Sequence, residues 1–514
     1  GPDGRLWVVE MGDYPRGEDG AGQPGGRVRF LEDEDGDGRF DTSTLFLDDL
    51  THPTGVFPWR KGVLITAAPE LLYAEDTDGD GRADTREVLY SGFVESNPQH
   101  RINGFAYGLD NWLYLGSGAS SGNVTSHRTG ETINMSGRDL RIRPDTGEFD
   151  AESGRTQYGR GRDDWGNWFG NTNSNPLFHF VVSDRYLRRN RDVAAPDPKV
   201  HLLTPPGAPP VFPSSRTVDR FNDLHAANRF TSACGPAVFR DPSLGESMYG
   251  SGFICEPVHN LVHRTIIEPN GVTFRGRRHE SEQQSEFLSS TDTWFRPVRV
   301  QTGPDGALWV ADMYRQVIEH PEWIPLDWQA KLDLRAGADK GRIYRVYRKG
   351  RRPGPLPKLA DLSTAELVKR LSSQNGPTRD LAQQLLVQRG DETVVPALKE
   401  LATSGDTPLP RIHALGTLDG LNALDAKLLS ELLRRADARV LPFAIRCCEP
   451  FLPEHPELGE ALVELAEHED LRVRFQLALS LGEWNDPRAG DALGQLALRD
   501  AGDEWMRAAI LSSA

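Results

Sequence analysis

Long hydrophobic runs are missing from this sequence, and so are the motifs of several common enzyme folds. No stretch approaches the roughly 20 apolar residues of a membrane-spanning helix. No Gly-x-Gly-x-x-Gly follows a strand pattern, no phosphate-binding loop occurs, and residues 116–120 lack the Gly-x-Ser-x-Gly nucleophile elbow. The sequence therefore offers no transmembrane segment, and it argues against a Rossmann-type dehydrogenase, a P-loop enzyme and a serine hydrolase.

Cysteine is also scarce, with 4 in the 514 residues. No Cys-x-x-Cys-His occurs, so we expect no covalently attached c-type haem in this chain. Cys447 and Cys448 are adjacent in a helical pattern, cannot pair with normal geometry, and are expected in the core. Cys234 and Cys255 flank a turn-rich segment. We predict a disulfide between them, as an oxidising compartment would favour, with two buried thiols as the alternative.

Positive charge is in deficit. Lys and Arg number 59 against 75 Asp and Glu, a net charge of −16, which argues against nucleic acid and anionic membranes as partners. The counts of 51 Gly and 36 Pro favour a turn-rich β architecture for much of the chain. The length allows two or three domains. Because the chain begins inside a repeat motif and stops inside a helical pattern, we expect truncation at both ends.

Two acidic loops carry the most specific pattern in the sequence. Loop 76–84 places carboxylates at positions 1, 3, 5 and 9 around a glycine at position 6, with Glu87 at position 12; loop 33–41 repeats this with Thr44 at position 12. This spacing suits a calcium ion, and the flanking strand patterns predict hairpin loops rather than helix-loop-helix hands. Solvated acidic turns are the alternative. The predicted ligands are Asp33, Asp35, Asp37, Asp41, Asp76, Asp78, Asp80, Asp84 and Glu87, in a structural role.

A turn-and-strand motif recurs along the first 350 residues. Residues 1–11 closely match residues 303–313, and residues 108–116 form a weaker copy. Each copy predicts a tight Asp-Gly or Asp-Asn turn before a strand with an aromatic side chain. Recurrent hairpins of this kind are typical of a β-propeller, and residues 1–350 are long enough for about six blades.

The pattern changes after residue 350. Residues 351–359 are rich in Gly, Pro and basic residues and are predicted to be a linker. Residues 360–514 show helical periodicity, with helix starts recurring about every 30 residues, as in paired-helix solenoids. Ser363 is the expected cap of the first helix, with Glu366 completing a capping box. The fold class predicted is therefore multidomain: an all-β propeller followed by an all-α, HEAT-like array.

Few residues combine suitable chemistry with a suitable place in this fold. His100 precedes a predicted inner strand, so it should face the mouth of the central channel, where a histidine can accept a proton from an alcohol. A histidine that joins two loops is the alternative. Arg296 precedes another blade strand and could hold an anionic group. Asp312 and Arg315 are candidates for the channel rim, with salt-bridged scaffolding as the alternative.

These motifs together resemble a known family. The repeats, the two acidic loops and residues 135–139, 255–260 and 311–315 resemble the membrane-bound dehydrogenases of planctomycetes, a haem-binding family. The resemblance implies an exported protein, periplasmic or extracellular, or membrane-associated through segments outside this sequence. It also implies a propeller like that of the quinoprotein glucose and sorbosone dehydrogenases, joined to HEAT repeats and then to a c-type cytochrome domain that this chain lacks.

The resemblance also implies roles for individual residues. His100 would be the base that takes a proton from a sugar or polyol, while hydride passes to pyrroloquinoline quinone. Arg101, Asn103 and Asp312 would contact the substrate, and Arg296 and Arg315 would pair with quinone carboxylates. One departure is residues 173–177, which lack the Arg and Gln of the quinone-binding Arg-Asn-Pro-Gln-Gly motif.

Two other functions fit the same sequence. The propeller could be a non-catalytic module that binds a carbohydrate or a protein, with the HEAT array as a docking surface for a protein partner. A metal-dependent lactonase in the channel is a further alternative, although no spare set of carboxylates and Asn obviously lines the channel.

Overall fold

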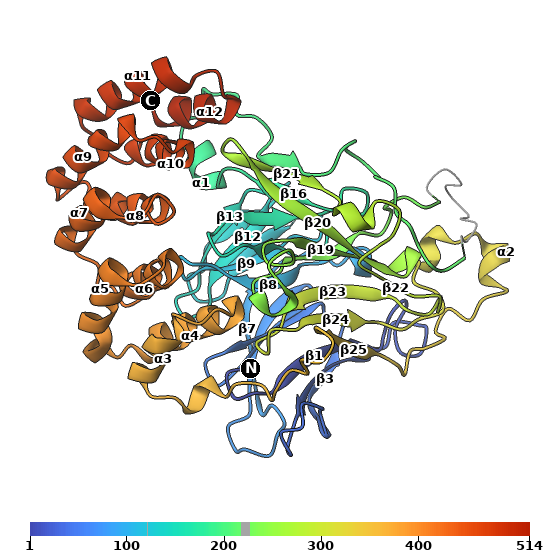
Figure 1. Ribbon diagram of the computed structural model, residues 1–514. Helices are drawn as coiled ribbons and strands as arrows, with labels where there is room; N and C mark the ends of the chain where they lie inside the picture. Colours follow the sequence, from blue (N-terminus) through green and yellow to red (C-terminus); the bar gives the residue numbers. More distant parts are fainter. Residues whose placement is uncertain (121, 217–226) are drawn as a thin grey trace.

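A computed structural model describes residues 1–120, 122–216 and 227–514, and it contains a six-bladed β-propeller followed by a helical array (Figure 1). No helix in these described ranges is both long and apolar enough to cross a bilayer. The strands of the first three sheets are β1 Leu6–Met11, β2 Gly26–Glu32, β3 Thr42–Leu50; β4 Gly55–Trp59, β5 Gly62–Ala67, β6 Glu70–Glu75, β7 Thr85–Ser91, β10 Asn123–Ser126, β11 Thr132–Asn134; β8 Asn103–Tyr107, β9 Leu113–Gly116, β12 Asp139–Arg143 and β13 Glu148–Glu152.

The other three sheets complete the ring. Their strands are β14 Gly161–Arg162, β15 Trp168–Gly170, β16 Phe178–Phe180, β17 Lys199–His201; β18 Cys234–Val238, β19 Gly252–Glu256, β20 Leu261–Asn270, β21 Thr273–Arg277, β22 Leu288–Ser289; β23 Pro297–Thr302, β24 Leu308–Asp312 and β25 Arg342–Val346. Neighbouring strands within each sheet are antiparallel, as a propeller blade requires.

The recurrent turn has a simple physical basis. In the copy before β24, the Asp305 carboxylate accepts hydrogen bonds from the Ala307 amide, at 3.1 Å, and from the Trp309 indole, at 2.8 Å. The turn residue therefore fixes the aromatic side chain of the strand that it starts. By sequence β1 corresponds to β24, yet β1 lies at the channel side of its three-stranded sheet and lines the lumen.

Helices α3 to α12 form the second part of the chain, and their succession confirms the predicted change to an all-α array. Ser363 and Glu366 form the predicted capping box at the start of α3. The helices are α1 Asp184–Leu187 and α2 Leu326–Gln329 in propeller loops, then α3 Thr364–Arg370, α4 Gly376–Arg389, α5 Val395–Ser404, α6 Pro408–Gly420, α7 Ala426–Arg435, α8 Leu441–Cys448, α9 Pro456–Val463, α10 Leu471–Leu481, α11 Pro487–Asp500 and α12 Glu504–Ser513.

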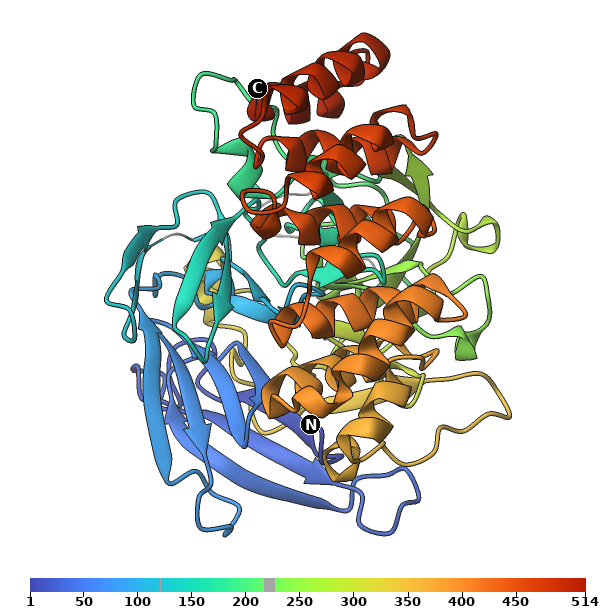
Figure 2. The same cartoon turned by 90° about the vertical axis from the view of Figure 1, so that its left-hand side faces the viewer.

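The helical array lies along one face of the propeller (Figure 2). Alternate helices make the contacts, beginning with α4, where the Gln383 amide donates to the Leu109 carbonyl at 3.0 Å. The carbonyl of Gly416 in α6 accepts from Asn111 at 2.8 Å, and Glu449, just after α8, pairs with Arg185 at 2.7 Å. One surface of the array is therefore occupied by the propeller of its own chain.

Candidate functional site

A cavity of about 1810 Å³ runs through the propeller, lined by inner strands from all six sheets. His100 and Trp323 line it where inner strands begin, and Asp380 and Gln384 of α4 line it where they end. Because Gln384 donates to the carbonyl of Pro58 near the end of β4, the helix packs against that end of the channel. We call the His100 end the mouth and the α4 end the base.

A buried ion network fastens α4 to the base of the channel. Asp380 accepts from Arg162 at 2.5 Å and from Arg240 at 2.6 Å, and Asp164 accepts from both Arg240 and Arg379 at 2.5 Å. Burial alone would raise the pKa of Asp380, but the two guanidinium groups hold it well below its usual range. The carboxylate therefore stays ionised and the helix stays paired to two propeller blades.

A close approach at the start of α4 makes this network possible. The Gly376 amide donates to the Arg240 carbonyl at 2.8 Å, and a Cβ at Gly376 would lie 2.7 Å from the Cβ of Arg240. Only glycine fits at this contact.

His100 lies at the mouth, as its position before an inner strand predicts. It ends the 3₁₀ turn Pro98–His100, which Asn97 caps, and β8 follows. The Gln157 amide nitrogen lies 2.5 Å from His100 Nε2, and Gln157 Oε1 accepts the Asn173 amide at 3.0 Å. Because Oε1 is engaged, the amide nitrogen must donate, so His100 Nε2 is the acceptor and the ring proton lies on Nδ1.

The environment of His100 favours this neutral form. Burial is the main cause that lowers the pKa of His100, and the positive charge of Arg155 lowers it further. The Tyr158 ring packs edge-on against the imidazole, with 6.4 Å between ring centroids. A neutral imidazole with an acceptor nitrogen at a channel mouth can take up a proton.

Two of the predicted substrate residues, Arg101 and Asn103, follow His100 closely in the chain, but they differ in availability. Arg101 is 6% exposed and donates to the Glu95 carbonyl at 2.6 Å, whereas its Nε and Nη1 have no hydrogen-bond partner among the described residues. Asn103 uses its amide nitrogen to hold the carbonyls of Arg101 and Gln157, at 2.8 and 2.9 Å. Asn103 thus braces the two segments that carry His100 and its partner.

The predicted cofactor arginines separate into two kinds. Arg296 donates to carbonyls of Arg315, Pro257 and Gln316 at 2.8 to 3.0 Å, so its guanidinium joins loops and has no free edge for an anion. Arg315 is 3% exposed, and its Nε and Nη1 lack partners among the described residues. Geometry therefore favours an anion-binding role for Arg315 and a scaffolding role for Arg296.

Asp312 lies at the end of β24, close to both arginines. Its Oδ1 accepts the amides of Arg296 and Tyr314 at 2.7 and 2.8 Å, while Oδ2 is buried without a partner in the described ranges. Burial raises the pKa of Asp312. Its hydrogen bonds order the rim, and only Oδ2 remains for a ligand.

Sequence reasoning missed three residues of the channel. Gln157 orients His100, Arg299 projects from β23 into the lumen, and Trp323 is 49% exposed on the rim. The sequence did offer a signal for Arg299, because it is the single arginine in the otherwise apolar start of an inner strand. Gln157 and Trp323 lie in irregular segments that carry no comparable pattern.

Both acidic loops are hairpin connections, as predicted, and they lie away from the mouth. Loop 33–41 joins β2 to β3, and loop 76–84 joins β6 to β7. In the antiparallel pair of β1 and β2, Met11 lies opposite Gly26, and Leu6 lies opposite Leu31. Loop 33–41 therefore follows the end of the sheet that is opposite to Met11. The Met11 carbonyl accepts a hydrogen bond from Arg315. A metal there would be structural rather than catalytic.

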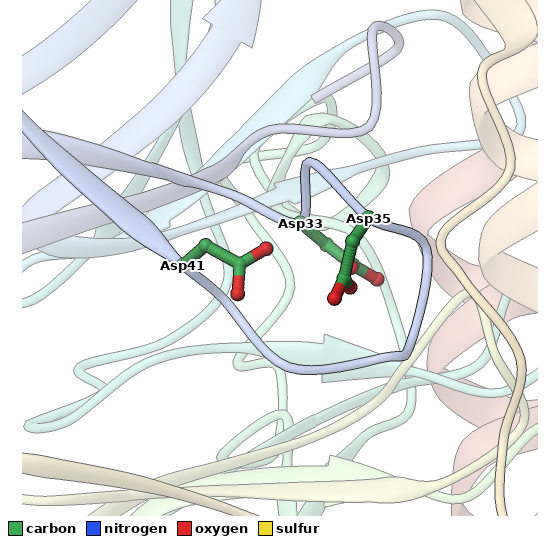
Figure 3. Close-up of side chains that lie close together, drawn as sticks. All are labelled: Asp33, Asp35 and Asp41. Carbon is green, nitrogen blue, oxygen red and sulfur yellow. The ribbon is translucent and has the colours of Figure 1, made fainter.

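Each loop brings together the carboxylates of positions 1, 3 and 9. The oxygens of Asp33, Asp35 and Asp41 lie within 4.8 Å of one another (Figure 3). The oxygens of Asp76, Asp78 and Asp84 do the same in the second loop. The remaining predicted ligands lie outside these groups. Asp37 is 3.5 Å from Arg352, Asp80 accepts the Arg82 amide at 2.7 Å, and Glu87 lies on β7, 3.6 Å from Arg128.

Calcium is expected to stabilise the protein through these loops. After treatment with a chelator, calcium at about 100 times its dissociation constant should add about 2.7 kcal/mol per site to the free energy of unfolding. The measurement is the thermal midpoint with and without calcium. In the variant Asp76→Asn/Asp78→Asn the gain should shrink, whereas Asp197→Asn, an exposed acid outside both loops, should keep it. An equal midpoint with and without calcium would contradict the prediction.

The cysteine pair has the required register. Cys234 on β18 lies directly opposite Cys255 on β19, and both are buried free thiols. Hydrogen bonding to Cys255, together with burial, raises the pKa of the Cys234 thiol. The predicted disulfide is thus not formed in this structure, and it stays a prediction for an oxidising compartment.

Comparisons with known proteins give likenesses of fold at low identity. The chain is similar to the luciferin-regenerating enzyme (10% identity, TM-score 0.37, 70% of this chain and 92% of that chain) and to a glucose dehydrogenase (14%, 0.34, 64% and 92%). It is also similar to the PQQ-bound form of aldose sugar dehydrogenase from Streptomyces coelicolor (14%, 0.30, 56% and 82%). These TM-scores are too low to carry an argument about function.

Sequence families give a clearer result. No curated protein matches the chain. HEAT repeats match residues 425–514, and the family described as Domain of unknown function (DUF7133) matches residues 1–350. Since that match spans more than half of its 514 residues, the chain belongs to the DUF7133 family.

Proposed function

We propose that this protein is an oxidoreductase that oxidises a hydroxyl group of a sugar or polyol at the mouth of the propeller channel. The observation that carries the proposal is the neutral imidazole of His100, whose acceptor nitrogen is fixed by Gln157 in a channel whose arginines Arg101 and Arg315 have no ion-pair partner among the described residues. A base and a set of cationic groups around one cavity suit hydride removal from an alcohol with an anionic cofactor.

The arginines fit a quinone that carries carboxylates. Arg101 and Arg315 are each nine-tenths or more buried, and each has guanidinium nitrogens without partners among the described residues. A buried cation is costly unless an anion pairs with it, so a ligand carboxylate would relieve both residues. Pyrroloquinoline quinone, a tricarboxylate, would be held by Arg101 and Arg315, and when bound it supplies the acceptor for hydride.

The channel mouth also suits a carbohydrate. Trp323 offers a half-exposed ring on the rim, and the polar residues Asn173, Ser174, Thr231 and Ser232 also line the cavity. Aromatic rings pack on the apolar faces of sugar rings, while amides and hydroxyls bond to sugar hydroxyls. The cavity volume of about 1810 Å³ leaves room for a cofactor and a substrate together.

The residues around His100 have separate roles in the proposed reaction. A substrate hydroxyl replaces the Gln157 amide as the donor to His100 Nε2, and the imidazole then takes the hydroxyl proton as hydride leaves the carbon. Gln157 stays anchored to the Asn173 amide, and Asn103 keeps the two loops in place. The packed Tyr158 ring excludes water from one side of the imidazole.

The resemblance noted from the sequence supports the wider setting of the reaction. Electrons would pass to a c-type cytochrome domain or another acceptor, and the protein would work in the periplasm or outside the cell. Neither part of this setting is needed for the chemistry at His100.

One experiment tests the proposal directly. The purified chain is loaded with pyrroloquinoline quinone and calcium, and reduction of an artificial dye is followed with a panel of sugars and polyols. Turnover with at least one of them, together with saturable quinone binding, is the expected result. Absence of both quinone binding and turnover would overturn the proposal.

Changing Gln157 to glutamate is expected to move the acid limb of the pH–rate profile upward. The wild-type rate should fall only below pH 6.5, because the pKa of His100 is lowered from that value and the base must be neutral. A carboxylate beside the imidazole stabilises its protonated form and should shift the limb up by about 1 to 3 pH units. The measurement is kcat/KM against pH.

The matched control is Gln157→Met, which removes the same amide without adding charge. Its acid limb should stay close to that of the wild type. Identical limbs in the wild type and Gln157→Glu would mean that His100 is not the titrating base.

A further inference from the structure

Arg299 is a cation in the lumen for which the described part of the chain supplies no ion-pair partner. It is the third residue of the inner strand β23 and lines the channel. Its guanidinium lies over Gly159, where a Cβ would be 2.7 Å from Nη1. Gly159 also has a φ of +84°, so both space and backbone conformation favour glycine at this position.

Within the described ranges, Arg299 has neither an ion pair nor a hydrogen bond. Its electrostatic neighbours are the thiols of Cys234 and Cys255, and burial lowers the pKa of Arg299. Two other arginines that line the same channel are paired with carboxylates. Arg29 lies 3.0 Å from Glu10, and Arg160 lies 3.0 Å from Asp139.

This contrast is informative because acidic residues are plentiful in the chain. The net charge is −16, yet among the described residues no carboxylate pairs with Arg299. A guanidinium removed from bulk water without an anion costs free energy, and the cost is recovered when a ligand brings the anion. The lumen therefore attracts negative charge within a negatively charged protein.

Arg299 is also placed to act on the same ligand as His100. The imidazole packs on Tyr158, and the guanidinium lies over Gly159, the next residue in the chain. The imidazole of His100 and the guanidinium of Arg299 therefore contact two consecutive residues, Tyr158 and Gly159, in the channel wall. A ligand with a hydroxyl at His100 can present a second polar group to Arg299.

We propose that Arg299 binds the carboxylate of an acidic sugar, so that the substrate is a uronate rather than a neutral sugar. The inference rests on the proposed function in taking the channel as the substrate site. The quinone carboxylates are assigned to Arg101 and Arg315 at the mouth, which leaves Arg299 for the substrate. A planar guanidinium suits a carboxylate through paired hydrogen bonds.

Titration calorimetry with D-glucuronate and D-glucose, on the full chain without quinone, tests the inference. The wild type should bind glucuronate at least about 10-fold more tightly than glucose, equivalent to about 1.4 kcal/mol. Arg299→Gln should lose this preference, and Arg299→Lys should keep part of it. The matched control Arg29→Gln, which changes a paired channel arginine, should keep the full preference.

Several results would overturn the inference. They are equal binding of the two sugars by the wild type, retention of the preference in Arg299→Gln, or loss of quinone binding in Arg299→Gln, which would place Arg299 in the cofactor site. The wild-type comparison needs no variant, so a folding defect in one variant cannot leave the question open. Glucuronate binding without turnover would contradict only the proposed oxidoreductase activity. Turnover of neutral sugars but not of glucuronate would contradict only the proposal that the substrate is a uronate.

Discussion

Replacing His100 with alanine is expected to lower kcat for sugar oxidation by about 10²- to 10⁴-fold, the usual contribution of a positioned general base. The loss should appear in kcat rather than in quinone affinity, because the guanidinium groups of Arg101 and Arg315, whose free nitrogens find no partner in the described part of the chain, are unchanged. The measurement is dye reduction at saturating sugar, combined with fluorescence titration of the quinone.

The control is His127→Ala. His127 is exposed and bonds to Ser91 at 2.8 Å on the outer part of a blade, so its loss should leave kcat near the wild-type value. The thermal midpoints of both variants should stay close to that of the wild type. If His100→Ala retained full kcat with bound quinone, the base would have to be another group and the assignment of His100 would be wrong.

Replacing Asp380 with asparagine is expected to lower the free energy of unfolding by about 3 to 5 kcal/mol, the usual cost of removing one partner from a buried ion pair. The change keeps the side-chain shape but leaves the guanidinium groups of Arg162 and Arg240 without their shared carboxylate. Burial and the two arginines together leave the pKa of Asp380 below its ordinary value of 3.8. The stabilisation is therefore present in full above that pH and is lost as pH falls further.

Denaturant unfolding at pH 7 measures the effect of Asp380→Asn, and limited proteolysis shows whether the helical array separates from the propeller. The matched control is Asp486→Asn, which breaks the exposed pair of Asp486 with Arg488 and should change stability very little. An equally small change in Asp380→Asn would mean that the network does not hold α4 against the channel.

The acidic loops show which structural features a local sequence pattern can predict. Their glycines and aspartates predicted hairpin connections, and the structure confirms them, because turn geometry depends on residues that are neighbours in sequence. The spacing also predicted Glu87 as a ligand at position 12, but the structure places Glu87 outside the group of Asp76, Asp78 and Asp84. After Asp84 the chain continues directly into β7, and the strand carries Glu87 away to Arg128.

The residues of the mouth depended on longer-range information. His100 could be placed near the channel because an inner strand follows it immediately. The roles of the five predicted cofactor and substrate residues could not be ranked, because the sequence does not reveal which nitrogens and oxygens are already engaged. Arg296 and Arg315 have similar sequence surroundings. Carbonyls surround the Arg296 guanidinium, whereas two nitrogens of Arg315 have no partner among the residues that the structure describes.

The sequence by itself determined the local elements: the Asp-Gly turns, the strands they start, the capped helices and the change from one class of structure to the other at about residue 350. Only the tertiary structure decided what those elements bring together. Gln157 reaches His100 across 57 residues, and Arg240 reaches Asp380 across 140. The physical reason is that a propeller closes through contacts between blades. Its channel therefore combines side chains that are far apart in the sequence, and the residues around each side chain do not reveal its partner.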